Sequence, residues 1–223
     1  MDAAPRHGER RTARPPGIRR HADLVAALVG LALFVPAAVI AHGGRVSDLE
    51  AAIFRSINHL PDALFPIANA AQFLGVLAVG PAVAVVALVV RRPRLAIAAL
   101  VVTALKLMAE RLVIWPLVYR ARPGTTTPGA IVRGNTPVDG AAFVSGHVIL
   151  ITALAWIVTP YLSGRWRWVP WLLVAIVIFA RVYLGAHNPL DVLGGFGMGL
   201  VVGGATNLIV GISASAEPEE IAA

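Results

Sequence analysis

Long apolar runs dominate this chain and limit what it can fold into. Short polar segments separate stretches of roughly 17 to 25 apolar residues, each long enough to cross a hydrocarbon core of about 30 Å as a helix. Inside such a core a span must satisfy its own backbone hydrogen bonds, which favours helices. The expected spans are Leu24 to Ala41, about Phe73 to Val90, Leu95 to Tyr119, Phe143 to Leu162, about Val169 to Gly185, and Pro189 to Gly211. The sequence therefore predicts an all-α bundle of six transmembrane helices.

The composition agrees with a membrane protein and argues against a nucleic-acid partner. Of the 223 residues 57% are hydrophobic and 14% are charged, and the mean hydropathy is +0.75. A soluble domain carries about 25% charged residues. The net charge of +7 comes mainly from arginines in the first 20 residues and in short loops, with no basic stripe interleaved with aromatic residues. We expect a lipid bilayer and no nucleic acid as partners.

The basic residues also indicate an orientation. If the N-terminal tail is cytoplasmic, the 91–94 and 165–167 turns are cytoplasmic too, and these three segments hold 11 of the 19 basic residues. Residues 1–22 are then a basic cytoplasmic tail, 23–212 the membrane domain and 213–223 an acidic cytoplasmic tail, and both tails are expected to be largely disordered. Loops 42–72, 120–142 and 185–190 face outward from the plasma membrane. Alternatively, the first span is a signal peptide cleaved after Ala41, which would leave the outward loops unchanged.

A second kind of helix is expected between the first two spans. Ser47 followed by Glu50 three residues later is a capping-box pattern, and Leu49, Ile53 and Ile57 then share one face. This segment is predicted to lie at the outer interface, either as a connector or as a lipid gate.

The sixth span carries Gly195, Gly199 and Gly203 at intervals of four residues. This spacing suits close helix packing, and packing within one chain is preferred over dimerisation. The oligomeric state stays open.

Polar residues gather at the outward ends of the spans. They are Arg120 and Arg122 after the third span, Ser145, Gly146 and His147 at the start of the fourth, Arg181 near the end of the fifth, and His187 and Asp191 around the start of the sixth. Arginines bind phosphate through two hydrogen bonds, and a helix N-terminus with small residues accommodates an oxyanion. Two histidines can provide a nucleophile and an acid, and Asp191 can hold one imidazole in the required tautomer. The sequence predicts a phosphoryl-transfer site.

These residues resemble the motifs of the type 2 phosphatidic acid phosphatase (PAP2) superfamily, which includes the vanadium haloperoxidases. The family pattern is Lys-x6-Arg-Pro, Pro-Ser-Gly-His and Ser-Arg-x5-His-x3-Asp. The chain has Arg122-Pro123 with Trp115 at the lysine position, Val144-Ser145-Gly146-His147, and Ala180-Arg181 followed at the same spacing by His187 and Asp191. The resemblance covers about residues 70 to 210 and implies a PAP2/haloperoxidase-like helical core.

The resemblance also implies roles. His187 would be the nucleophile that forms a phosphohistidine, with Asp191 orienting it, and His147 would protonate the leaving group and then activate water. Arg122, Arg181, Ser145 and the Gly146 amide would hold the phosphoryl oxygens. The phosphatase branch implies no metal and no cofactor.

Trp115 removes a phosphate-binding cation from this pattern. We expect Arg120 to replace it, in preference to Arg111 one turn before Trp115. Lys106 and Glu110 are expected to pair on one helix face. At about 1.5 Å per residue Lys106 would lie roughly 13 Å below Trp115, too deep for phosphate, which predicts a structural role.

The sequence thus predicts an integral membrane phosphatase that hydrolyses a lipid phosphate or pyrophosphate at the outer face. Polyprenyl pyrophosphate, phosphatidic acid and phosphatidylglycerophosphate are all compatible substrates. The alternatives are a phosphotransferase that passes the group to a lipid or sugar acceptor, and a non-catalytic lipid-phosphate binder whose site has decayed at Trp115. A haloperoxidase is disfavoured because the familiar members of that branch are soluble.

Overall fold

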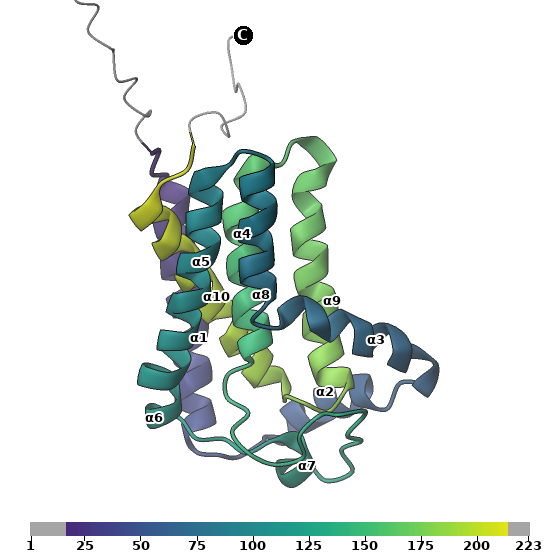
Figure 1. Ribbon diagram of the computed structural model, residues 1–223. Coiled ribbons are helices and arrows are strands. Elements are labelled where there is room, and N and C mark those ends of the chain that lie inside the picture. Colours follow the sequence, from purple (N-terminus) through teal and green to yellow (C-terminus); the bar gives the residue numbers. More distant parts are fainter. Residues whose placement is uncertain (1–16, 214–223) are drawn as a thin grey trace, which may run out of the picture.

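The structure is a computed structural model that describes residues 17–213. The predicted tails therefore lie mostly outside the described residues. The N-terminal tail was expected to reach residue 22, but the first helix already begins at His21. Ile18 pairs with Ile212 in an antiparallel bridge, so the two ends of the described chain meet at the same end of the molecule (Figure 1).

Helices make up nearly all of the regular structure between residues 17 and 213. The α-helices are α1 (His21–His42), α2 (Asp48–Asn58), α3 (Phe65–Ala71), α4 (Val79–Val89), α5 (Pro93–Met108), α6 (Trp115–Leu117), α7 (Pro123–Thr126), α8 (Gly146–Val158), α9 (Val169–Tyr183) and α10 (Pro189–Val210). Short 3₁₀ segments are η1 (Asp62–Leu64), η2 (Gln72–Gly75), η4 (Thr159–Tyr161) and η5 (Gly164–Trp168), and η3 (Ala109–Ile114) is a π-helix.

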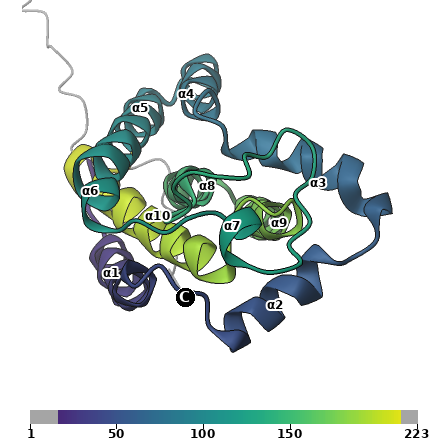
Figure 2. The ribbon, with the colours of Figure 1, turned by 90° about the horizontal axis from the view of Figure 1, so that it is seen from below.

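Helices α1, α4, α5, α8, α9 and α10 run side by side along the bundle (Figure 1). Seen along its axis, α8 lies near the centre, while α2 and α3 cross one end of the bundle (Figure 2). The glycines of α10 explain the close approach of its neighbours: a Cβ on Gly199 would lie 2.5 Å from the Thr152 Cβ of α8, and one on Gly203 would lie 2.9 Å from the Trp156 Cβ. The predicted close packing of Gly195, Gly199 and Gly203 within one chain is confirmed.

The expectation of six spans is confirmed only in part. By length and composition, three helices in the described range can each cross a membrane: His21–His42, Gly164–Tyr183 and Pro189–Val210. A fourth span is possible if Asp62–Gly75 and Val79–Val89 act together, but they meet at an angle of 69°. The predicted second span therefore bends sharply near its start, and Gly146–Tyr161 is a shorter apolar helix.

The predicted third span is not a regular helix. After α5 the chain widens into the π-helix Ala109–Ile114 and ends in the single turn of α6. A π-helical turn holds more residues than an α-helical turn, so side chains after residue 109 are rotated from their expected directions. Trp115 accordingly stays 49% exposed.

The interfacial helix α2 begins where its sequence predicted. The Ser47 hydroxyl accepts a hydrogen bond from the Glu50 amide at 3.2 Å. Leu49 and Ile53 remain exposed, whereas Phe54 is buried in the bundle. The Glu50 side chain does not return to Ser47 but points into the molecule, where Arg120 binds it.

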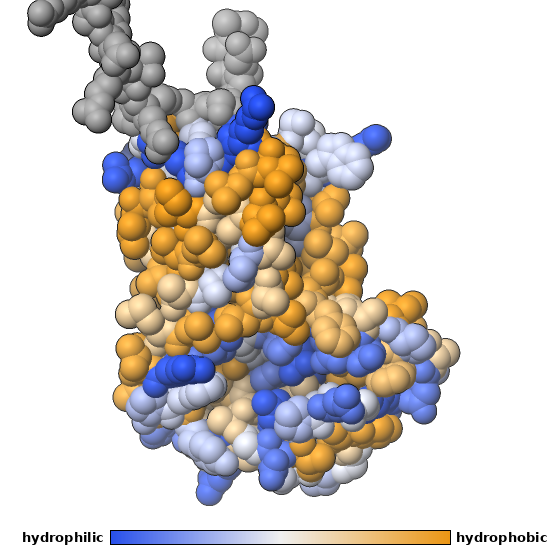
Figure 3. All heavy atoms as spheres, viewed as in Figure 1, coloured by the Kyte–Doolittle hydropathy of each residue, from blue (hydrophilic) through white to orange (hydrophobic). Residues whose placement is uncertain are grey.

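Polar and apolar surfaces are segregated along the bundle axis. Hydrophobic residues cover the upper and middle parts of the face in Figure 3, and hydrophilic residues gather at the top rim and across the lower part. The lower end holds α2, α3, α7 and the starts of α8 and α10, opposite the two chain ends (Figure 1). The polar residues singled out in the sequence therefore meet at the end remote from the termini.

Candidate functional site

The starts of α8 and α10 are joined directly. Ser145 stands at the N-cap of α8, and its amide donates to the Asp191 carbonyl of α10 at 3.1 Å. Gly195 lets the two helices approach, because a Cβ there would lie 2.8 Å from the Ser145 carbonyl oxygen. The two segments with the Ser-Gly-His and His-x3-Asp patterns are thus adjacent in space, although α8 begins three residues later than predicted.

The first turn of α10 has Asn188 as cap and Pro189 as first residue. The Asn188 amide donates to Asp191 Oδ2 at 2.8 Å. The Asn188 side-chain oxygen accepts from the Thr127 hydroxyl at 2.9 Å, which ties the segment after Arg122 to the same turn. Thr126 belongs to the short helix α7.

His187 is buried beside Asp191. Its Nδ1 lies 3.9 Å from Asp191 Oδ2, an ion-pair distance that is longer than a hydrogen bond. Burial lowers the pKa of His187 well below its ordinary value of 6.5, and the charges of Arg181 and Arg122 lower it further. The imidazole is therefore neutral at neutral pH, which is the form that can attack phosphorus.

His147 lies in the first turn of α8. The segment η2 packs against it so closely that a Cβ on Gly75 would lie 2.6 Å from the His147 Cβ. The charges of Arg181, Lys106 and Arg122 all act on its imidazole, which places these cations around the same space.

Arg181 is buried and Arg122 is half-buried, and both cations have only neutral hydrogen-bond partners. Arg122 donates to the Ala186 carbonyl at 2.9 Å, and Arg181 donates to the Gln72 side-chain oxygen at 2.8 Å. Among the described residues neither has a carboxylate within 4.0 Å, and both Nε atoms are buried without a partner. The Ser145 hydroxyl is likewise buried without a partner in this part of the chain. Because a buried, uncompensated charge is costly, this arrangement suits an anion.

Arg120 lies elsewhere than its sequence position suggested. Its side chain is fully buried, and Nη1 donates to Glu50 Oε1 and to Asp191 Oδ1, both at 3.0 Å. Nη2 donates to the second Glu50 oxygen and to the Arg45 carbonyl. The guanidinium is thus bound by two carboxylates, those of Glu50 and Asp191, and it does not join Arg122 and Arg181.

The other residues around the missing lysine divide into two groups. Arg111 and Trp115 are exposed on the surface of the bundle. Lys106 and Glu110 form the predicted ion pair at 2.6 Å. Lys106 also lies against the first residue of α8, because a Cβ on Gly146 would lie 3.0 Å from Lys106 Nζ.

Two contributors to the site went unnoticed in the sequence. Gln72 holds Arg181, and Glu50 holds Arg120 and also accepts from the Leu190 amide at 2.9 Å. Gln72 and Asn69 are isolated polar residues in an apolar stretch, which is a weak signal. Glu50 was assigned to a capping box, so its long-range contact could not be expected.

No cluster of three or more histidine, cysteine, aspartate or glutamate side chains that could hold a metal ion occurs between residues 17 and 213. The polar groups of the site are instead two histidines, one aspartate and several cations. A multi-pass helical membrane protein with such a site has the features of a phosphate-binding enzyme of the bilayer.

The chain belongs to the PAP2 superfamily, whose sequence profile matches residues 94–213, more than half of its length. Over 62 residues it is 36% identical to a lipid A 4'-phosphatase of Porphyromonas gingivalis, a match that spans 27% of this chain and 26% of that protein. The chain thus matches about a quarter of the length of this curated relative.

Two crystal structures share the fold. One is Aquifex aeolicus LpxE, with a TM-score of 0.61, 20% identity and coverage of 73% of this chain and 98% of that chain. The other is a transmembrane PAP2 type phosphatidylglycerolphosphate phosphatase of Bacillus subtilis, with a TM-score of 0.59, 20% identity and coverage of 80% and 94%. At this identity the likeness shows the helical membrane fold.

Proposed function

We propose that the protein hydrolyses a phosphomonoester or pyrophosphate carried by a lipid, through a phosphohistidine on His187. The observation that carries this proposal is the pair of arginines without acidic partners within 4.0 Å, Arg122 and Arg181, beside two histidines at adjoining helix ends. Membership of the PAP2 superfamily supports it. So do the names of its relatives, a lipid A 4'-phosphatase and a phosphatidylglycerolphosphate phosphatase.

Each step uses a group that the site holds. Arg122, Arg181, Ser145 and the Gly146 amide bind the phosphoryl oxygens. His187 attacks phosphorus through Nε2, the nitrogen remote from Asp191, and a nitrogen–phosphorus bond forms as the bond to the lipid oxygen breaks. His147 protonates that oxygen as it leaves.

The second half returns the enzyme to its starting state. His147, now neutral, takes a proton from water as the water oxygen attacks the phosphohistidine. The nitrogen–phosphorus bond breaks, inorganic phosphate leaves, and both histidines regain their original protonation. Asp191 stabilises the positive charge that His187 carries in the intermediate.

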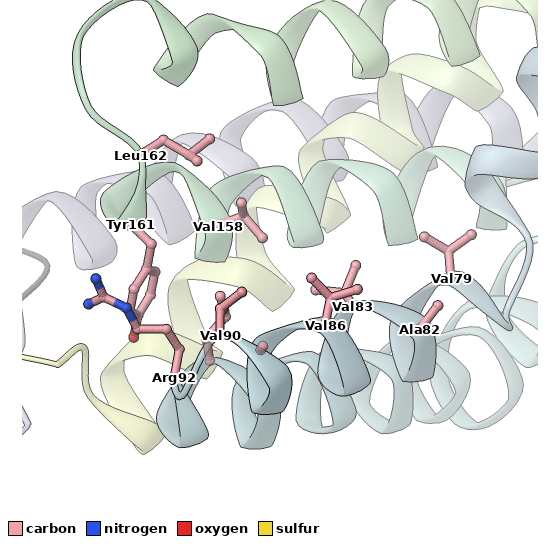
Figure 4. A pocket seen from close by; sticks show the side chains of 11 residues that line it. Val79, Ala82, Val83, Val86, Val90, Arg92, Val158, Tyr161 and Leu162 are labelled. Atoms are coloured by element: carbon pink, nitrogen blue, oxygen red, sulfur yellow. The ribbon is translucent and has the colours of Figure 1, made fainter.

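Two apolar grooves support a lipid substrate. One, of about 570 Å³, lies between α4 and the end of α8, and Arg92 lies over the Tyr161 ring at its end (Figure 4). The second, of about 360 Å³, shares Val79 and Leu162 with the first and extends along α8 and α9 to Leu74. Leu74 adjoins Gly75, which packs on His147. We assign this route to the hydrocarbon chain of the substrate, with its phosphate between the histidines.

The finer points of topology belong to the same proposal. The six helices that run side by side would each cross the bilayer, with α5, η3 and α6 acting as one irregular span. Both chain ends would be cytoplasmic and the site would face outward, because the basic turns lie at the end of the termini. The reaction would need no metal ion.

The substrate class follows from this orientation and from the relatives. Lipid A phosphates, phosphatidylglycerophosphate, phosphatidic acid and polyprenyl pyrophosphate all present a phosphate at the membrane surface beside a long apolar chain. Transfer to a lipid or sugar acceptor is the alternative, and it differs only in what attacks the phosphohistidine.

Phosphate release tests the proposal. The purified protein in detergent with EDTA is given each of these lipids, with His187→Ala as the matched control. We expect inorganic phosphate from the wild type and none from the variant. Release that EDTA abolishes would contradict the metal-free reaction, and a phosphorylated acceptor without free phosphate would establish the transferase. An equally active His187→Ala would refute the mechanism.

A further inference from the structure

The buried ion pair Lys106–Glu110 lies against the first residue of α8. Lys106 Nζ lies 2.6 Å from Glu110 Oε2, and the exposed fractions of the two side chains are 13% and 7%. A Cβ on Gly146 would lie 3.0 Å from Lys106 Nζ and would overlap the Glu110 carboxylate. A side chain at position 146 would therefore displace the ends of Lys106 and Glu110, which occupy the space beside Gly146.

Burial of an ion pair at a helix contact costs more free energy than an apolar contact of the same size. Removing two charges from water costs several kcal/mol per ion, and apolar residues of similar size often serve equally well or better. Ionisable side chains within membrane helices are generally functional for the same reason. Here the pair contacts the residue between Ser145 and His147, and the Lys106 charge acts on the His147 imidazole.

The neighbouring cations Arg120 and Arg111 have different surroundings from Lys106. Arg120 is bound by Glu50 and Asp191, and Arg111 is exposed on the outside of α5 and its π-helical extension. Trp115 is also exposed. The wide turn at Ala109–Ile114 separates these two directions, with Lys106 and Glu110 toward α8 and residues 111 and 115 away from it.

We infer that Lys106 is a phosphate-binding residue of the site. Its ammonium group, held at the N-terminus of α8 by Glu110, adds a cation to those of Arg122 and Arg181 on the side of Gly146. Glu110 is a positioning residue that holds Lys106 at α8 in the absence of substrate. This inference rests on the proposed function, and it names the cation that Trp115 fails to provide.

The two roles of the pair make opposite predictions for its two members. If the pair only holds helices together, loss of either charge is equivalent, and replacing both by apolar residues restores the protein. If Lys106 binds phosphate, the protein stays defective whenever Lys106 is absent. The informative variants are Lys106→Met, Glu110→Met and the double variant Lys106→Met/Glu110→Met, with Arg111→Ala as an exposed control on the same helix.

Binding of inorganic phosphate is measured by the thermal stabilisation that it gives, which does not depend on turnover. We expect Lys106→Met and the double variant to bind phosphate about 10- to 100-fold more weakly, because a charged hydrogen bond is lost. Arg111→Ala should bind phosphate within about threefold of the wild type, and Glu110→Met should lose less affinity than Lys106→Met, because the lysine remains. In lipid hydrolysis the same loss should appear as a higher KM, and Lys106→Arg should restore most of it.

Wild-type phosphate affinity in the double variant would overturn the inference and leave Lys106 with a structural role. Equal losses in Lys106→Met and Glu110→Met, both repaired in the double variant, would do the same. A wild-type protein that binds phosphate but releases none from any lipid would instead refute the proposed function, and the comparison of phosphate affinities would still decide the role of Lys106.

Discussion

Replacement of Arg120 by methionine removes the cation between two buried carboxylates. Nη1 donates to Glu50 and to Asp191 at 3.0 Å each, and the arginine side chain has no exposed surface. Methionine fills most of the volume and provides no donor. Glu50 and Asp191 then remain buried beside each other without compensation.

The magnitude follows from this geometry. Removing one partner of a buried ion pair costs about 3–5 kcal/mol, because the other charge stays buried and unpaired. The total stability of a domain is about 5–15 kcal/mol, so the loss should be evident in thermal unfolding. Asp191 also loses a bond that fixes its position next to His187, and misplacement of a catalytic group by about 1 Å can cost about 10²-fold in rate. We expect kcat to fall by about that factor.

Phosphate affinity separates this explanation from the one that the sequence suggested. If Arg120 acts only through Asp191, Arg120→Met should leave the affinity for inorganic phosphate within about threefold of the wild type. Glu50→Gln is the matched variant, since it keeps the Arg120–Asp191 bond, and it should lose less stability and less activity. A tenfold or greater loss of phosphate affinity in Arg120→Met, with kcat unchanged, would refute the reasoning and restore Arg120 as a phosphate ligand.

Three further perturbations test other parts of the structure. Gly195→Ala should cost about 1–3 kcal/mol and reduce activity, because its Cβ would press on the Ser145 carbonyl 2.8 Å away, whereas Gly43→Ala, with no atom closer than 3.9 Å, should match the wild type in thermal unfolding and in phosphate release. Since the folded-state pKa of His187 lies below 6.5, the unfolded chain binds more protons at low pH, so about 1.4 kcal/mol of stability should be lost as the pH falls from 7.5 to 5.5. His187→Gln should lack this part of the pH dependence of thermal unfolding, and identical profiles would contradict the assigned shift. The Arg181 guanidinium donates to the Gln72 side-chain oxygen at 2.8 Å, so Gln72→Glu would place a carboxylate against this cation. We expect this variant to raise KM about tenfold or more in a hydrolysis assay, whereas Gln72→Ala should raise KM less.

The sequence predicted those parts of the site that depend on local spacing. His187 and Asp191 lie just before and within the first turn of α10, with Asn188 as its cap, so their arrangement follows from their spacing in the sequence. The approach of α8 to α10 was also predictable, because glycines at intervals of four residues leave room for a second helix.

Arg120 was misplaced for a different reason. Its assignment assumed a straight α-helix from Leu95 to Tyr119, but a π-helix at Ala109–Ile114 changes both the rise and the direction of every later side chain. A single-sequence pattern carries no mark of such a turn, because the residues in it are ordinary helix formers. The position of the Arg120 side chain also depends on Glu50, which is 70 residues away in the sequence.

The contact between Glu50 and Arg120 bears on the role of α2. This helix keeps Leu49 and Ile53 exposed, next to the residue whose carboxylate binds Arg120 and the Leu190 amide. Arg120 in turn binds Asp191, so α2 and the first turn of α10 share one buried network of charges. A mere connector between two spans would need no such network. Displacement of α2 would therefore act on Asp191 through Arg120, since loss of Glu50 leaves the guanidinium with one carboxylate in place of two.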